Sequence, residues 1–159
     1  VAEKMQASRM TQPVEFVMTD KNNNPIAFSR LAYLFKFELS ADFLKQLDES
    51  FSVYVVLDGE DVRLGLGLSA KDAAGLAQRV GKEEGLLPYA LRSLYVLSGE
   101  TVSPARRMIF KAGNHNGQTI RYVNIDVSQN VSLDYVLREK QWLIGTSKNS
   151  LRLLLDNTR

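Results

Sequence analysis

The feature that most restricts how this chain can fold is an Asp-Gly pair between two runs of alternating apolar residues. Asp58-Gly59 separates residues 51–57 from residues 60–68. This arrangement is typical of a β-hairpin, because a two-residue type I′ turn needs positive φ at both central positions. The segment Phe51–Leu68 is therefore predicted to be two antiparallel strands.

The same turn predicts the register of these strands. With Asp58-Gly59 as the loop, Val55 is expected to pair with Val62, and Val53 with Leu64. Alternate apolar residues then share one face, which is expected to lie against the core. The opposite face, called the outer face below, carries Ser52, Tyr54, Val56, Asp61, Arg63, Gly65 and Gly67.

Two more hairpins are predicted in the second half of the chain. Asn116-Gly117 is another type I′ signal, between strands at residues 107–114 and 118–127. Their alternation places Phe110 and Val123 on the core side, and Lys111 and Tyr122 on the outer face. A third hairpin spans residues 133–146 and turns near residues 139–140. It directs Tyr135, Leu137, Trp142 and Ile144 to one side.

Between and after the hairpins, the sequence predicts helices. Ser69 is expected to cap a helix to Val80, and Ser147 to cap a final helix with an inner stripe of Leu151, Leu154 and Leu155. Residues 32–39 are expected to be a strand. Strands joined by tight turns run antiparallel, so the prediction is an α+β fold with an antiparallel sheet of five to seven strands and helices packed mainly on one face.

Composition limits the class of protein. The chain of 159 residues fits one domain, predicted at residues 13–159 after a polar lead-in at residues 1–12. A net charge of +2 is too small for the basic footprint that nucleic-acid binding requires, so no nucleic-acid partner is expected. The absence of cysteine excludes disulfides and thiolate metal sites.

No catalytic or metal-binding constellation emerges from the residues. Gly65-Leu66-Gly67-Leu68-Ser69-Ala70 matches a permissive dinucleotide fingerprint, but the glycines fall inside a hairpin strand, where that fingerprint requires a parallel βαβ unit. The alternative interpretation is that small residues here allow another backbone to approach closely. His115 is the only histidine, and its Asn-His-Asn-Gly context is typical of a solvated turn. We expect no enzyme, metal or cofactor.

The outer face offers a candidate contact surface. Tyrosine and basic side chains are common anchors at protein interfaces. The residues expected to form this surface are Tyr54, Arg63, Gly65, Gly67, Lys111 and Tyr122. Two alternatives stay open: the segment 15–37 covers this face, or the domain binds a small ligand or nucleotide at Gly65 and Gly67.

The C-terminal third resembles a known type of domain. The residues that carry the likeness are Gly117-x-x-Ile120-Arg121-Tyr122-x-Asn124, then Leu133-Asp134-Tyr135, then the run from Trp142 to Ser150. They are similar to the last unit of uncharacterised bacterial envelope domains, in which an α+β domain follows a single membrane-spanning helix. The likeness covers residues 115–159, and the hairpin at residues 51–68 more loosely.

This resemblance implies a location and an architecture, and it brings no catalytic residue with it. The expectation is a non-enzymatic protein-interaction domain of a bacterial cell-envelope protein, outside the cytoplasmic membrane. Contact with the membrane would be made only through an anchor that is not in this sequence, and a cytoplasmic location is the alternative. The partner is expected to be a protein.

Overall fold

The computed structural model describes residues 12–103 and 107–158. The polar lead-in predicted at residues 1–12 therefore lies outside the described residues, except for Gln12. The strands are β1 (Val14–Phe16), β2 (Leu47–Asp58), β3 (Asp61–Ala70), β4 (Lys111–His115), β5 (Gln118–Asp126), β6 (Val131–Arg138) and β7 (Gln141–Gly145). The helices are α2 (Phe28–Leu34), α3 (Ala41–Leu44), α4 (Ala73–Glu83), α5 (Leu87–Ala90) and α6 (Lys148–Asn157), with short 3-10 turns at Glu84–Leu86 and Arg92–Tyr95.

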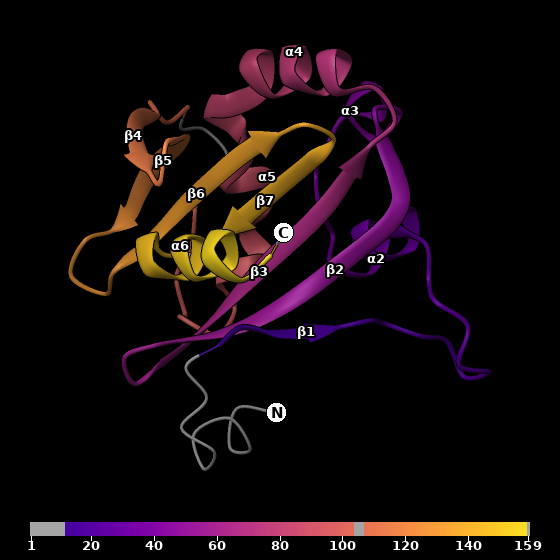
Figure 1. The fold of residues 1–159 in the computed structure, drawn as a ribbon, viewed down its shortest axis with the longest axis horizontal. Coiled ribbons are helices and arrows are strands. Elements are labelled where there is room, and N and C mark those ends of the chain that lie inside the picture. Colours follow the sequence, from indigo (N-terminus) through magenta and orange to yellow (C-terminus); the bar gives the residue numbers. More distant parts are fainter. Residues whose placement is uncertain (1–11, 104–106, 159) are drawn as a thin grey trace.

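The strands form one sheet of seven in the order β1-β2-β3-β7-β6-β5-β4 (Figure 1). Every neighbouring pair is antiparallel. The predicted α+β class, with an antiparallel sheet of five to seven strands, is confirmed. The fold arises from tight hairpins, because β2–β3 and the run β4–β5–β6–β7 each pair in chain order.

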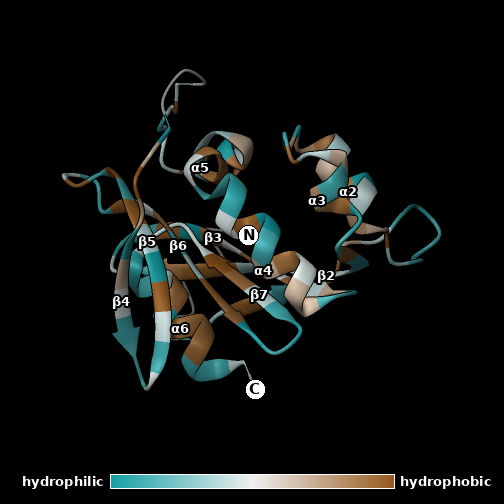
Figure 2. Ribbon diagram, turned by 90° about the horizontal axis from the view of Figure 1, so that it is seen from above, coloured by the Kyte–Doolittle hydropathy of each residue, from teal (hydrophilic) through white to brown (hydrophobic). Residues whose placement is uncertain are grey.

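The helices lie in two unequal layers. Figure 2 shows α2, α3 and α5 on one side of the sheet and α6 on the other. The larger layer encloses the main core, which includes Phe28, Leu31 and Phe43 from the helical side and Leu66 and Trp142 from the sheet. Helices are thus packed mainly on one face, as predicted, and the C-terminal helix is the exception.

The first hairpin is confirmed, but its predicted register is wrong by two residues. Val55 pairs with Leu64 and Val53 with Leu66, and the turn is Gly59-Glu60. Within this turn positive φ is confined to Gly59 (68°), as at the first central position of a type II′ turn. Side chains alternate with a period of two, so the shift leaves every residue on its predicted face.

The second and third hairpins have the predicted turns. Asn116 and Gly117 both have positive φ, at 49° and 79°. Lys111 pairs with Tyr122, which is the predicted register, although β4 begins at Lys111 and not at residue 107. In the third hairpin Arg138 pairs with Gln141, leaving residues 139–140 as the turn.

One predicted element is wrong, and the helix predicted from Ser69 to Val80 begins later, as α4 at Ala73. Residues 32–39 are not a strand, because the end of α2 and a loop occupy this segment, and Leu31 and Ala32 are buried against the core. Ser69 does not cap a helix; it pairs with Gln141 as part of β3, and Asp72 caps α4 by accepting from the Ala74 amide at 3.1 Å. Hydrogen bonds to β7 extend the strand beyond the local capping signal.

Within the described residues, no helix has the length and apolar character that a bilayer span needs. The same residues bring together no group of three or more His, Asp or Glu side chains that could hold a metal ion.

Candidate functional sites

The C-terminal helix α6 covers the middle of the predicted outer face. Its inner stripe of Leu151, Leu154 and Leu155 is buried as predicted, but against the face opposite the main core. The cover is therefore α6 and not the segment 15–37, whose α2 packs into the main core. We call the α6 side of the sheet the outer face, as before.

Two glycines let α6 lie close to the sheet. Gly65 in β3 pairs with Gly145 in β7. A Cβ atom on Gly145 would lie 2.7 Å from the backbone nitrogen of Leu151, and one on Gly65 would lie 2.7 Å from Cδ1 of Leu154. The sequence led us to expect close approach of another backbone at Gly65 and Gly67. The space at these two glycines is taken by the side chains of Leu154 and Tyr54, and the backbone of α6 approaches Gly145 instead.

Three more of the predicted contact residues are also covered: Tyr54 by α6, Gly67 by the Tyr54 ring, and Arg63 next to the β5–β6 turn. Tyr54 is 8% exposed and packs with Val56 and Leu154. Its ring lies over Gly67, where a Cβ atom would be 3.1 Å from Cε2 of the ring. Arg63 is 4% exposed and donates to the carbonyl oxygen of Gln129 at 2.6 Å. Tyr54 and Arg63 are therefore structural, and the prediction of an open surface at these residues is wrong.

The remaining two predicted residues, Lys111 and Tyr122, stay accessible. Both belong to a row of paired residues that crosses the outer face of the whole sheet: Glu15, Tyr54, Gly65, Gly145, Asp134, Tyr122 and Lys111. Helix α6 covers the middle of this row, and the end of the row at Tyr122 and Lys111 is left open.

The uncovered part of the outer face is hollowed into a polar pocket. Its volume is about 370 Å³, within the range of small-ligand sites. Its floor and walls include Asp134, Ser132, Tyr122, Asn124, Lys148 and Arg152. These residues come from β5, β6 and α6, so a tertiary contact between hairpin and helix creates the pocket.

Asp134 is the most unusual residue of the pocket. The residue as a whole is 2% exposed, and within the described residues the one hydrogen bond to its carboxylate comes from the Ser132 hydroxyl. Burial raises the pKa of Asp134 to about 6, while the Ser132 hydrogen bond and the charges of Lys148 and Arg152 oppose this rise. A buried carboxylate facing two cations is an arrangement that proteins often use to bind a ligand.

The two basic residues of the pocket, Lys148 and Arg152, are positioned by the first turn of α6. Ser147 caps this helix and forms a capping box with Ser150. The Asp58 carboxylate, at the end of β2, accepts from the Ser147 hydroxyl at 2.6 Å and from the Asn149 amide at 2.8 Å. Lys148 and Arg152 follow one turn apart, which places both on the same side of the helix.

Other titratable clusters have structural roles. Glu84 accepts from Arg121 at 2.7 and 2.8 Å and from the Tyr135 hydroxyl, which ties the helical layer to β5 and β6. The Arg121 hydrogen bond holds the pKa of Glu84 below its usual value. His115 lies 2.8 Å from the Asp156 carboxylate, so this turn histidine contacts the end of α6.

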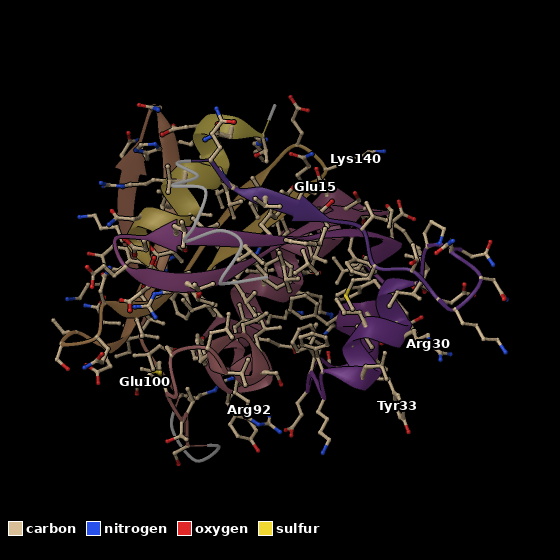
Figure 3. The ribbon with its side chains drawn as sticks, turned by 90° about the horizontal axis from the view of Figure 1, so that it is seen from below. Glu15, Arg30, Tyr33, Arg92, Glu100 and Lys140 are labelled. Atoms are coloured by element: carbon tan, nitrogen blue, oxygen red, sulfur yellow. The ribbon has the colours of Figure 1, made fainter. Side chains whose placement is uncertain are left out.

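A second surface lies on the helical side. Four large apolar side chains are more than half exposed there: Tyr33 (83%), Leu34 (54%), Val96 (67%) and Leu97 (53%). Leu34 and Val96 border an apolar groove of about 490 Å³ between the end of α2 and residues 92–102. Figure 3 shows Tyr33 and Arg92 projecting on this side, away from the sheet.

Sequence reasoning did not find the pocket, although part of the signal was present. Ile120, Val136 and Leu143 are buried under α6 on the outer face. The neighbours of Val136 and Leu143 along their strands are apolar as well, and strands that are apolar on both faces indicate a sheet covered on both sides. Asp134 stands out within this apolar β6 segment, which is the pattern of a buried carboxylate.

The chain was also compared with known proteins. No protein-family model, no curated protein and no solved structure matches it.

Proposed function

We propose that this chain is a non-enzymatic binding domain and that it holds a small polar ligand in the pocket between β5, β6 and α6. The observation that carries this proposal is the buried Asp134 carboxylate, which lines a pocket of about 370 Å³ and accepts one hydrogen bond within the described residues. An ionised group in such a place is under-solvated, and a ligand that donates to it relieves that cost.

Two further features support a ligand site. Lys148 and Arg152 line the pocket, and neither forms an ion pair within residues 12–103 and 107–158. Tyr122 adds an aromatic ring next to Asp134, with which it pairs across β5 and β6. Convergent polar groups around an aromatic ring are the usual composition of a site that orients a small molecule.

The test is a ligand screen on the wild-type domain and on a variant with a filled pocket. Thermal unfolding is followed in the presence of amino acids, monosaccharides, nucleotides and small carboxylic acids. A compound at 100 times its dissociation constant stabilises the folded state by about 2.7 kcal/mol. At least one class should raise the unfolding temperature of the wild type.

The filled variant is Asn124→Trp, because Asn124 is exposed and lines the pocket. Its matched control is Thr119→Trp, an exposed position of β5 on the opposite face. Stabilisation should disappear in Asn124→Trp and persist in Thr119→Trp. No stabilisation by any class, or equal stabilisation of both variants, would contradict the proposal.

A second candidate is protein interaction through the apolar surface of Tyr33, Leu34, Val96 and Leu97, in keeping with a role in the bacterial cell envelope. Contiguous exposed apolar side chains are typical of protein contact sites. Arg30 and Lys36 flank this surface and form no ion pair within the described residues, which favours a partner segment that joins apolar and acidic residues.

Selection from a displayed peptide library on the immobilised domain tests this second candidate, with Tyr33→Ser/Val96→Ser as the counter-selection. Both side chains are more than half exposed, so the double variant should keep its stability. Enrichment of acidic-apolar peptides on the wild type alone supports the contact, and equal enrichment on both proteins rejects it. The envelope location, which the C-terminal resemblance supports, is tested separately by protease accessibility in spheroplasts.

A further inference from the structure

The charges of the pocket restrict what it can hold. A simple anion would face the buried Asp134 carboxylate, and a simple cation would face Lys148 and Arg152. Asp126 also lines the pocket, but its Oδ1 atom already accepts from Ser128 and Gln129 in the turn that follows β5. The two signs do not neutralise each other by direct contact, because within the described residues Asp134 forms no ion pair with either cation. A ligand that carries both charges satisfies both sides of the pocket.

The two kinds of charge also come from different elements. Asp134 lies on the strand β6, and the cations lie on the first two turns of α6, which begins at Lys148. The positive end of the α6 dipole adds to the cationic side, since an anion near a helix N-terminus is stabilised. The Arg152 Nε atom is buried and has no hydrogen-bond partner within the described residues. Its N–H group is therefore a donor that no described residue uses.

The side of the pocket next to Asp134 suits a group that donates several hydrogen bonds. The Ser132 hydroxyl occupies Oδ1 of the carboxylate, which leaves Oδ2 to accept from a ligand. A primary ammonium has three N–H donors, and it can also reach the side-chain oxygen of Asn124 or Tyr122. Ile120 and Val131 supply an apolar part of the lining for a ligand side chain.

From these three observations we propose that the ligand is a free α-amino acid, with its ammonium group at Asp134 and its carboxylate at Lys148 and Arg152. This inference rests on the proposed ligand-binding function and names the chemical class of the ligand. The pocket volume of about 370 Å³ accommodates a molecule of this size.

The decisive experiment compares free amino acids with two blocked forms by isothermal titration calorimetry on the full chain. An N-acetyl amino acid lacks the ammonium, and an amino-acid amide lacks the carboxylate. Each removes one charge-assisted hydrogen-bonded contact, so each should bind about ten- to hundred-fold more weakly than the free amino acid. If either blocked form binds as tightly as the free form, the proposed pairing of charges is wrong.

Variants of the pocket give the complementary measurement. Asp134→Asn and Lys148→Gln/Arg152→Gln should each weaken binding of the free amino acid about tenfold or more. Lys140→Gln removes a cation of the β6–β7 turn that does not line the pocket, and it should leave the affinity unchanged. Equal affinity of Asp134→Asn and the wild type would overturn the assignment.

The outcomes separate the ligand class from the function itself. If monosaccharides bind, amino acids do not, and Asn124→Trp abolishes the binding, then the pocket is a ligand site but the amino-acid assignment is wrong. Inorganic phosphate serves as the probe for a simple anion site. Phosphate that binds with the same affinity as the amino acid, through Lys148 and Arg152 alone, also overturns the assignment.

Discussion

At the scale of single residues, the outer face is shaped by side chains that are unusual for their positions. Gly65 and Gly145 pair between β3 and β7 and admit α6, while Tyr54 fills the space over Gly67. Asp134, in the same row, is a carboxylate under the edge of that helix. Across the sheet, this row of paired residues is therefore closely packed against α6 at β3 and β7 and reaches the polar pocket at β6.

Asp134 makes stability depend on pH. Its pKa rises from an ordinary value of 3.8 to about 6 in the folded protein, so the folded state holds this proton more tightly than the unfolded state. Stability is therefore lost as the pH rises from about 4 to 6, and the loss persists above pH 6. Asp134→Asn should remove this loss and stabilise the protein by about 2–3 kcal/mol at pH 7.

Urea unfolding at pH 4 and pH 7 measures this effect. The two proteins should be nearly equal in stability at pH 4 and differ at pH 7, because only the wild type carries the buried charge there. Glu84 makes the opposite contribution to the pH dependence of stability, because Arg121 lowers its pKa. Both proteins contain Glu84, so its contribution cancels when the stability of the wild type is subtracted from that of the variant. If Asp134→Asn is less stable than the wild type at pH 7, the prediction is wrong. Ser132, Lys148 and Arg152 would then stabilise the ionised carboxylate by more than its burial costs.

At the scale of elements, α6 depends on a contact from a distant turn. Its capping box is formed locally by Ser147 and Ser150, but Asp58 from the end of β2 accepts from Ser147 and Asn149. It also accepts from the Asn130 amide at 2.9 Å, next to the pocket. One carboxylate thus joins the β2–β3 hairpin, the β5–β6 turn and the start of α6.

Asp58→Ala should therefore destabilise the protein by about 1–2 kcal/mol, because it removes a helix cap contact and leaves donors without a partner. Urea denaturation followed by far-UV circular dichroism measures the change. Glu60→Ala is the matched control, since Glu60 is an exposed residue of the same turn, and it should change stability by less than about 0.5 kcal/mol. Equal effects of the two substitutions would argue against the contact.

At the scale of the whole molecule, the sheet is shared by two cores. The larger core contains Trp142 between Phe43 and Tyr135, with ring centroids 5.2 and 6.1 Å from the indole. The smaller core lies under α6, where Leu154 is fully buried. Strands β2, β5, β6 and β7 contribute buried residues to both sides, so the two cores are expected to unfold together.

Leu154→Ala tests this coupling. The substitution removes a buried leucine from the smaller core and should destabilise the protein by about 2–5 kcal/mol. Trp142 is the only tryptophan and reports on the larger core. Its fluorescence transition should shift together with the circular-dichroism transition, as in a two-state protein. A fluorescence midpoint that does not move would show that α6 and its core unfold independently.

The sequence alone determined the local geometry of the sheet. The pair Asn116-Gly117 fixed a turn and a register, and the alternation in residues 133–146 placed Tyr135, Trp142 and Ile144 correctly. These features depend on neighbouring residues and on a side-chain period of two, which the sequence shows directly. The register of β2 and β3 differs from the predicted one by two residues. This difference changes the cross-strand partners but leaves each side chain on its predicted face, again because the side-chain period is two.

Only the tertiary structure decided what covers each face. A stripe of leucines in α6 indicates burial but does not say against which surface, because the hydrophobic effect is non-directional. The choice depends on the match between α6, the glycine pair and the apolar residues under it, which come from strands far apart in the chain. That choice buried Tyr54, left Tyr122 open, and placed Lys148 and Arg152 beside Asp134.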